Sequence, residues 1–346
     1  MGIERTVRLR FAAHAVEADT HVNLSAIHTD GSLLWIAGDE TATIERLTCD
    51  DPSAPAEYGQ HVTFALDTLI RLPGAADEEV DVEGMAHTGD YLWVVGSHSA
   101  KRKKVKDEHD DEKSAKRLAA VSAEPARRVL ARLAMDGDEP VAEASDGRRS
   151  AALGKHGLFG LLAEDEHFGP FLGIPGKDNG FDIEGIAVHG DAGAERVFLG
   201  MRGPVLRGWA AVLQLEPRVD GDELKLAKIA DKRRYAKHFL DLGGLGIRDM
   251  CEYGEDLLIL AGPTMDLDGP VRVFRWPGAA ALSAPDVVRR EDLHQVLEIP
   301  YGEGTDHAEG IALLPDDRLL VVYDSPASTR LPQPGTVLAD VFALPR

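Results

Sequence analysis

The chain is poor in cysteine: only Cys49 and Cys251 occur among 346 residues, and they lie far apart in the sequence. A disulfide framework or a structural zinc site needs several cysteines at short, regular spacings. The sequence therefore argues against both, and we expect two reduced, buried thiols.

Long hydrophobic runs are also missing. No stretch approaches the roughly 20 consecutive apolar residues that span a membrane. The first residues, MGIERTVRLRFAAHAVEAD, lack the apolar core of a secretory signal. We expect a cytoplasmic protein without a membrane partner, although a mature form that has lost its signal would look the same.

Basic residues are outnumbered, with 38 Lys and Arg against 59 Asp and Glu and a net charge of −21. Nucleic-acid binding depends on neutralising phosphates, so this balance argues against a nucleic-acid partner. A small anionic substrate or ligand stays compatible, and surplus carboxylates suit a hard cation such as calcium. The simplest interpretation of the charge is solubility, and we expect a monomer or a weak oligomer.

The sequence is rich in glycine and in a repeated motif. Glycine occurs 35 times and proline 19 times, which is typical of many short strands joined by tight turns. A Glu-Gly pair flanked by apolar residues occurs three times, each time followed by a polar turn and an apolar strand. The copies are Val82–Met85, Ile183–Ile186 and Ala308–Ile311, with weaker copies at Leu24–Ile27 and Ile247–Met250. Such repeats predict an all-β fold, a β-propeller.

We call one residue of each copy its anchor. The anchors are Ser25, Glu83, Glu184, Arg248 and Glu309. Their spacing favours five blades in a single domain, 1–346, with six blades as the alternative. The longest gap predicts an insertion at 101–175 that contains a charged, mobile loop and a short helix; a lid over the channel is the alternative for the loop. The strand TVRLRFAA near the N-terminus is expected to close the ring as the outer strand of the last blade.

The innermost strands of a propeller surround its channel, so the anchors are expected to meet there. Three glutamates at close range cannot all stay ionised without a cation. We therefore expect Ser25, Glu83, Glu184 and Glu309 to hold calcium, with magnesium as the alternative. The other interpretation is structural: the glutamates cap backbone amides and the glycines permit close packing.

Polar residues at the ends of the second strands form another candidate set. Arg202 lies between glycines and, with Arg248, is expected to bind a phosphate or carboxylate; structural ion pairing is the alternative. His98 is a candidate general base, although a lone histidine is more often a surface or hydrogen-bonded structural residue. Asp182, two residues before Glu184, is a second candidate for proton transfer, orienting a metal-bound water. Asp39 and Asp324 complete the predicted substrate-binding set.

Three of these segments also carry a family resemblance. The Asp-x-Glu-Gly strands, the segment Gly200–Pro204 and the strand Arg248–Met250 resemble a bacterial domain-of-unknown-function propeller family. That family is loosely grouped with phytase-like esterases, and the resemblance covers nearly the whole chain. It implies a propeller without a firm activity.

A more remote resemblance is to calcium-activated apyrases, five-bladed propellers whose axial calcium is held by serine and glutamate. Ser25, Glu83, Glu184 and Glu309 match that order, whereas Arg248 stands where a second serine belongs. The resemblance implies a calcium-dependent hydrolase of phosphate esters or phosphoanhydrides. The alternative is a non-catalytic propeller that binds a small ligand or a protein.

Overall fold

The computed structural model describes residues 2–38, 41–75, 78–154, 156–229, 233–282 and 284–345. Its strands form consecutive groups, each arranged from the inside outward, and we call each group a blade. Blade 1 contains β2 (Leu24–Asp30), β3 (Leu33–Gly38), β4 (Thr43–Thr48) and β5 (Glu57–Ala65). Blade 2 contains β6 (Val82–Thr88), β7 (Tyr91–Gly96), β10 (Leu130–Asp136) and β12 (Ala151–Leu153). β11 (Glu139–Val141), β16 (Pro217–Asp220) and β17 (Glu223–Leu226) extend its sheet.

The remaining strands continue this order. Blade 3 contains β13 (Asp182–His189), β14 (Arg196–Gly203), β15 (Ala210–Leu215), β18 (Ala236–Leu240) and β22 (Asp286–Val288). Blade 4 contains β19 (Gly246–Tyr253), β20 (Asp256–Gly262), β21 (Val271–Trp276) and β23 (His294–Ile299). Blade 5 contains β24 (His307–Leu314), β25 (Arg318–Asp324), β26 (Thr336–Ala343) and β1 (Arg5–Arg10).

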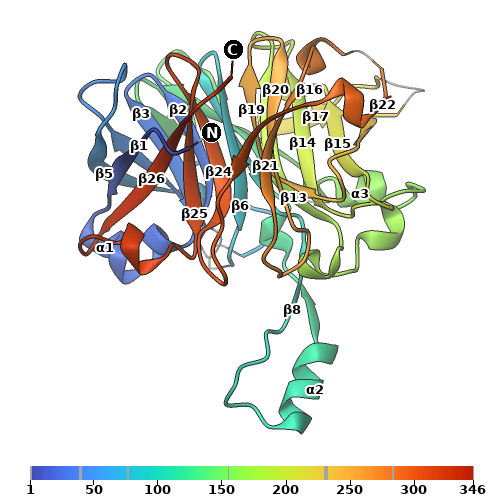
Figure 1. Cartoon of the computed structure of the whole chain (residues 1–346). Helices are drawn as coiled ribbons and strands as arrows, with labels where there is room; N and C mark the ends of the chain where they lie inside the picture. The colour runs from blue at the N-terminus through green and yellow to red at the C-terminus, as the bar shows by residue number, and fades with distance from the viewer. Residues whose placement is uncertain are drawn as a thin grey trace.

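The inner strands form a closed ring. β2 contacts β6, β6 contacts β13, β13 contacts β19, β19 contacts β24, and β24 returns to β2. Figure 1 shows the blades standing around this centre. The prediction of a β-propeller is therefore confirmed.

The hydrophobic core is divided among the faces between neighbouring blades. Trp35 of blade 1 packs in one cluster with residues of blade 2, and Trp93 of blade 2 packs in the next cluster with residues of blade 3. Equivalent clusters join the other neighbouring pairs of blades. The second strands β3, β7 and β20 are buried along their whole length because both of their faces meet a neighbouring blade, which explains their uninterrupted apolar sequences.

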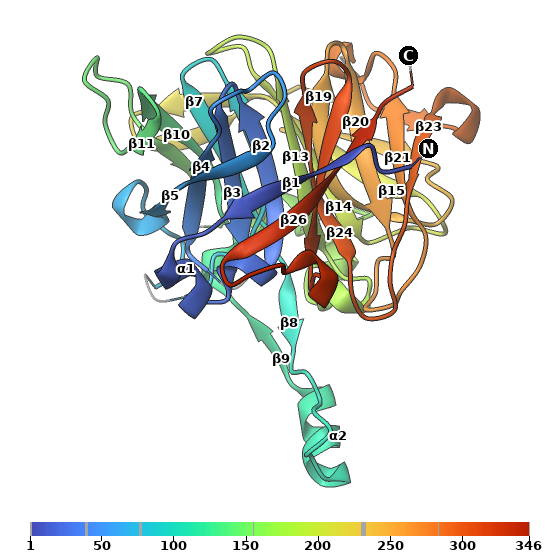
Figure 2. The ribbon, with the colours of Figure 1, turned by 60° about the vertical axis from the view of Figure 1, so that its left-hand side comes forward.

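The N-terminal strand closes the ring, as predicted. β1 pairs antiparallel with β26 from Arg5 to Arg10 and parallel with β5 at Arg8 and Leu9. Figure 2 shows β1 running beside β26 at the seam between blades 5 and 1. The two blades thereby share one sheet, and the first and last parts of the chain cover each other's edges.

The range 101–175 is only partly an insertion. β8 (Ala100–Arg102), α2 (Asp111–Ala119) and β9 (Val121–Ala123) form an arm that projects from the body (Figures 1 and 2). The charged segment therefore contains a helix instead of being loop throughout, because Asp110 caps the amide of Lys113 at 2.7 Å. β10 and β12 belong to blade 2, and α3 (Phe159–Leu162) follows them.

One further helix, α1 (Ala13–Glu17), follows β1. None of the helices in the described ranges has the length and apolar character needed to cross a membrane.

The glycines after the anchors permit the close approach of the inner strands. A Cβ atom at Gly84 would lie 2.8 Å from Ile186 Cγ2 and 3.0 Å from its amide nitrogen. Gly185 meets the backbone of blade 4 in the same way, at 3.0 Å from Met250 N. The structural interpretation of these glycines is therefore supported.

We predict that Gly84→Ala destabilises the protein by about 1–3 kcal/mol, because the new methyl group overpacks the contact with Ile186. Urea unfolding measures the effect. Gly173→Ala is the matched control, since a Cβ atom there meets nothing within 4 Å. Equal unfolding midpoints for the two variants would contradict this explanation.

Candidate functional site

Every anchor is a β-bulge residue. In β2, Leu24 pairs with Gly38 and Ala26 pairs with Ala37, so that Ser25 is left out of the ladder. The same interruption occurs in the other inner strands and leaves out Glu83, Glu184, Arg248 and Glu309. A bulge releases a side chain from the alternation between the two faces of a blade. The repeat therefore places one released side chain per blade near the axis.

Two arginines join the released carboxylates. Arg202, on β14, contacts Asp182 Oδ2 and Glu184 Oε1, each at 2.5 Å. Arg248 pairs with Glu309 and lies 3.7 Å from Glu184 Oε2. We call these five residues the axial network, which links blades 3, 4 and 5.

Glu83 belongs to the same electrostatic environment. Burial opposes the charge of Arg202, but Asp182, Glu184, Glu309 and Glu83 outweigh it and raise the pKa of this arginine. The structure thus brings together three of the predicted metal ligands and both predicted anion-binding arginines.

Ser25 has a different environment. Its hydroxyl donates to Val82 O at 2.7 Å and to Ala37 O at 3.2 Å, which ties blade 1 to blade 2. Asp249, next to Arg248, plays a similar part by accepting from the amides of Met250 and Ile311, both at 2.7 Å. Hydrogen bonding to the backbone is therefore a second role of residues at or beside the anchors.

Two carboxylate oxygens in the axial network accept no hydrogen bond from the described residues. Glu184 Oε2 and Asp182 Oδ1 are buried and, within the described residues, have no hydrogen-bond partner. Burial, with help from Glu309 and Asp182, raises the pKa of Glu184 to about 8 against the opposing effect of the two arginines. Burial also raises the pKa of Asp182 to about 6. Burial thus works against the negative charges of both carboxyl groups, and Arg202 works in their favour.

The predicted calcium site stays a prediction. No group of three or more His, Cys, Asp or Glu side chains in the described part of the chain is arranged to hold a metal ion. Calcium prefers six to eight oxygen ligands, whereas the axial network offers two buried oxygens without a partner among the described residues, and Arg202 is already bound to both of their carboxyl groups. The residues present do not by themselves fit calcium.

His98 is buried away from solvent. Its side chain is 0% exposed, its Nδ1 lies 2.8 Å from Gly96 O, and its Nε2 faces Gly157. Burial lowers the pKa of His98 to about 4, so the ring is neutral at pH 7. The exclusion of solvent argues against the predicted role as general base, although Nε2 has no hydrogen-bond partner among the described residues.

Asp39 and Asp324 are the other two predicted substrate-binding residues. Asp39 lies outside the described residues. Asp324, at the end of β25, is close to the axial network: burial and Glu309 raise its pKa, while Lys177 and His307 act in the opposite direction.

A small cavity opens beside Arg248. Its volume is about 20 Å³, and its walls include Arg248, Pro263, Leu267, Tyr301 and His307. Asp268 also lines it and accepts from His307 Nε2 at 3.2 Å and from the amide of Gly304 at 3.0 Å. The carboxylate thereby orients an imidazole at the edge of the axial network. We call this feature the Arg248 cavity.

The sequence interpretation missed the His307–Asp268 pair. A signal was present, because His307 precedes its anchor by two residues, as Asp81 and Asp182 precede theirs. The partner Asp268 lies in a connecting segment of blade 4 and could not be inferred from that repeat.

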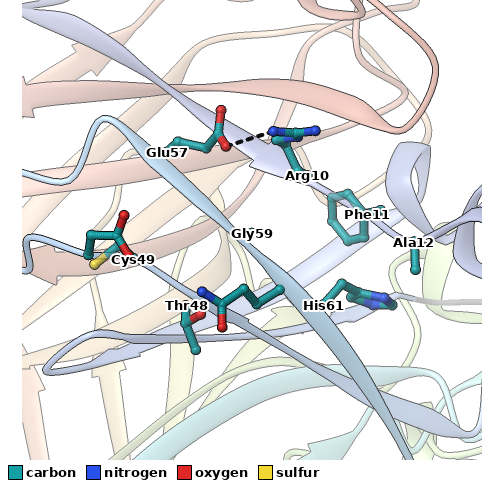
Figure 3. Close-up of a pocket in the computed structure, with 10 residues that line it drawn as sticks. Arg10, Phe11, Ala12, Thr48, Cys49, Glu57, Gly59 and His61 are labelled. Atoms are coloured by element: carbon teal, nitrogen blue, oxygen red, sulfur yellow. Dashed lines mark hydrogen bonds and ion pairs between the residues drawn. The ribbon is translucent and has the colours of Figure 1, made fainter.

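A larger cavity, of about 420 Å³, lies at the seam between β1 and β5 (Figure 3). Arg10 and Glu57 form an ion pair of 3.1 Å on its wall. The side chain of His61 is only 1% exposed and packs 2.8 Å from Glu45, and burial raises the pKa of Cys49. The reactive groups of this seam are thus withdrawn from solvent, and the Arg248 cavity is the better candidate.

We predict that the free energy of unfolding falls as pH rises from the ordinary range of a glutamate pKa towards about 8, and that it levels off above 8. The pKa of Glu184 is raised by folding, so its contribution is fully present below the pKa of the unfolded chain and is lost as the folded carboxyl ionises. The free energy of unfolding then decreases by up to about 1.4 kcal/mol per pH unit. Thermal melts between pH 6 and 9 test this, and Glu184→Gln should flatten the curve. If the variant keeps the pH dependence of the wild type, another titrating group causes that dependence.

Three comparisons place the chain among known proteins. No curated protein matches its sequence. Three solved structures are similar over most of the chain at low TM-scores. Myxococcus xanthus glutaminyl cyclase is 10% identical, with 100% of this chain and 97% of that chain covered and a TM-score of 0.42. Streptomyces coelicolor aldose sugar dehydrogenase is 13% identical, with 99% of this chain and 98% of that chain covered and a TM-score of 0.38. Aleuria aurantia lectin is 9% identical, with 88% of this chain and 73% of that chain covered and a TM-score of 0.35.

Likenesses this remote say nothing about activity, and they do not extend the resemblance to phytase-like esterases or apyrases. The model of one family matches residues 23–340 and confirms the predicted relationship to a family of unknown function. The chain belongs to the family described as "Protein of unknown function (DUF3616)".

Proposed function

We propose that the chain is a hydrolase of phosphate esters or phosphoanhydrides whose active site is the Arg248 cavity. One observation carries the proposal: the guanidinium of Arg248 and the imidazole of His307, which Asp268 orients, line one small cavity beside the axial network. These are groups that bind an oxyanion and accept a proton.

Arg248 has the position for the substrate anion. Its Nη1 pairs with Glu309 and its Nη2 donates to Pro263 O at 3.0 Å, which hold the guanidinium at the cavity wall. A planar guanidinium matches the geometry of a phosphoryl group. Arg202 lies behind Glu184 and keeps that carboxyl in place.

His307 supplies the proton transfer at phosphorus. Oriented by Asp268, it accepts a proton from the attacking water as the water oxygen bonds to phosphorus. Solvent protonates the leaving oxygen as the phosphorus–oxygen bond breaks, because Glu184 is buried and does not line the Arg248 cavity. His307 then returns its proton to solvent, so the protons balance. This arrangement moves the predicted catalytic role from His98 to His307, and it assigns Asp182 the task of holding Arg202.

A specific observation favours a second candidate function. Arg202 and Arg248 each already bridge two carboxylates, so the axial network resembles a closed, hydrogen-bonded plug. In that case the protein is a non-catalytic propeller, and the network serves stability. The two candidates differ in whether His307 affects any reaction.

We predict that the wild-type protein hydrolyses p-nitrophenyl phosphate or bis(p-nitrophenyl) phosphate and that His307→Asn lowers kcat by about 100-fold or more. Release of p-nitrophenol provides the measurement. His294→Asn is the matched control, because His294 lies exposed on the outer strand β23. Hydrolysis of neither ester by the wild type would favour the plug, and equal rates in both variants would remove His307 from the mechanism.

Calcium dependence is tested separately. An axial calcium, as expected from the sequence, requires that calcium raise the melting temperature of EDTA-treated protein by mass action, whereas the ion-paired carboxylates of the axial network predict no shift. Any shift that does occur should be abolished by Glu184→Gln, and magnesium serves as the comparison ion. If neither ion shifts the melting temperature, calcium has no place in the proposed function.

A further inference from the structure

The rim of the Arg248 cavity is apolar and exposed. Leu267 is 62% exposed and Tyr301 is 47% exposed, and both line the cavity. Met265, at 45%, lies in the same connecting segment as Leu267. Asp268, in the same segment as Leu267, accepts hydrogen bonds from Gly304, which precedes β24, and from His307, at the start of β24. These bonds hold the apolar rim beside the imidazole of His307.

The size of the cavity limits what enters it. A volume of about 20 Å³ accommodates a group about the size of a single water molecule. A phosphoryl oxygen fits this space, whereas an organic substituent does not. Any larger part of a ligand held by Arg248 must lie outside, on Leu267 and Tyr301.

The charges around Arg248 limit the ligand further. Its guanidinium lies between Glu309 and Glu184, and Asp324 is within electrostatic reach of Glu309. A dianion would gain one cation while approaching several carboxyl groups, at least one of which is charged. Both the attraction to Arg248 and the repulsion from the carboxylates scale with the charge of the ligand, so a monoanion is repelled less than a dianion where carboxylates outnumber the guanidinium.

We propose that the substrate is a monoanionic phosphodiester with an apolar, aryl or alkyl, group that lies on Leu267 and Tyr301. This inference rests on the proposed function, because it names the substrate class of the same site. Water replaces one alkoxy or aryloxy group on phosphorus, and the products are a phosphate monoester and an alcohol. The apolar rim selects the substituent, and Arg248, whose guanidinium lines the cavity, selects the charge.

Three probes separate these two features. Diphenyl phosphate is an aryl monoanion, dimethyl phosphate is a monoanion without aryl groups, and phenyl phosphate is an aryl dianion near pH 8. NMR titration of the full chain gives their affinities. We expect diphenyl phosphate to bind about tenfold or more tightly than dimethyl phosphate, because its rings bury apolar surface. We also expect it to bind more tightly than phenyl phosphate.

The double variant Leu267→Ser, Tyr301→Ser should lose the preference for diphenyl phosphate and keep its affinity for dimethyl phosphate. Both side chains are exposed, so the fold should be retained, and circular dichroism checks this. Val219→Ser is the matched control, because Val219 is also exposed, at 42%, on β16. This control should behave as the wild type does.

The outcomes are distinguishable. Equal affinities for the three probes, no binding of any probe, or an unchanged preference in the double variant would each overturn the inference. If diphenyl phosphate binds as expected but bis(p-nitrophenyl) phosphate is not hydrolysed, the assignment of the ligand class stands and the proposed hydrolase activity fails.

Discussion

Carboxylates buried at the centre of this propeller need positive charge within a few ångströms, and Arg202 and Arg248 supply it. Removing ionised groups from water costs several kcal/mol each, so such a cluster persists only when ion pairs and proton uptake offset that cost. Both effects act here: Arg202 binds Asp182 and Glu184, and burial raises the pKa of Glu184.

The bulges explain how a repeated sequence produces this centre. In an uninterrupted strand, side chains alternate between the two faces of a blade and pack against its neighbours. A bulge at every anchor releases one side chain per blade, and the residue that follows lets the inner strands approach closely. Blades 1 and 4 depart from this pattern: Ser25 and Ala26 replace Glu and Gly in blade 1, and Arg248 and Asp249 replace them in blade 4. The arginine brings a cation to the axis, and the aspartate bonds to the backbone of blade 5.

The site was predictable to the extent that it follows the repeat. Period-two alternation and recurring motifs predicted the propeller and its closure by β1. The anchors indicated Glu184, Glu309 and Arg248, and the end of a second strand indicated Arg202. The exposure of His98 could not be predicted, because the turn around Gly157 that covers it comes from another part of the chain. The helix α2 was also missed, since a mixed-charge segment without an apolar face resembles a loop in sequence. His307 was detectable from its register, whereas its partner Asp268 was not.

The sequence alone determined the strands, their repetition and the surplus of acidic residues, because these depend on local periodicity and composition. The tertiary structure decided which charges meet. Arg202 lies on a second strand and reaches the axis only because β14 has its own irregularity opposite Asp182 and Ile183. A buried carboxyl group of the axial network can bind a metal, pair with an arginine or hold a proton. Distances and burial across three blades decide which of these states it takes, and residues more than a hundred positions apart set those distances and that burial.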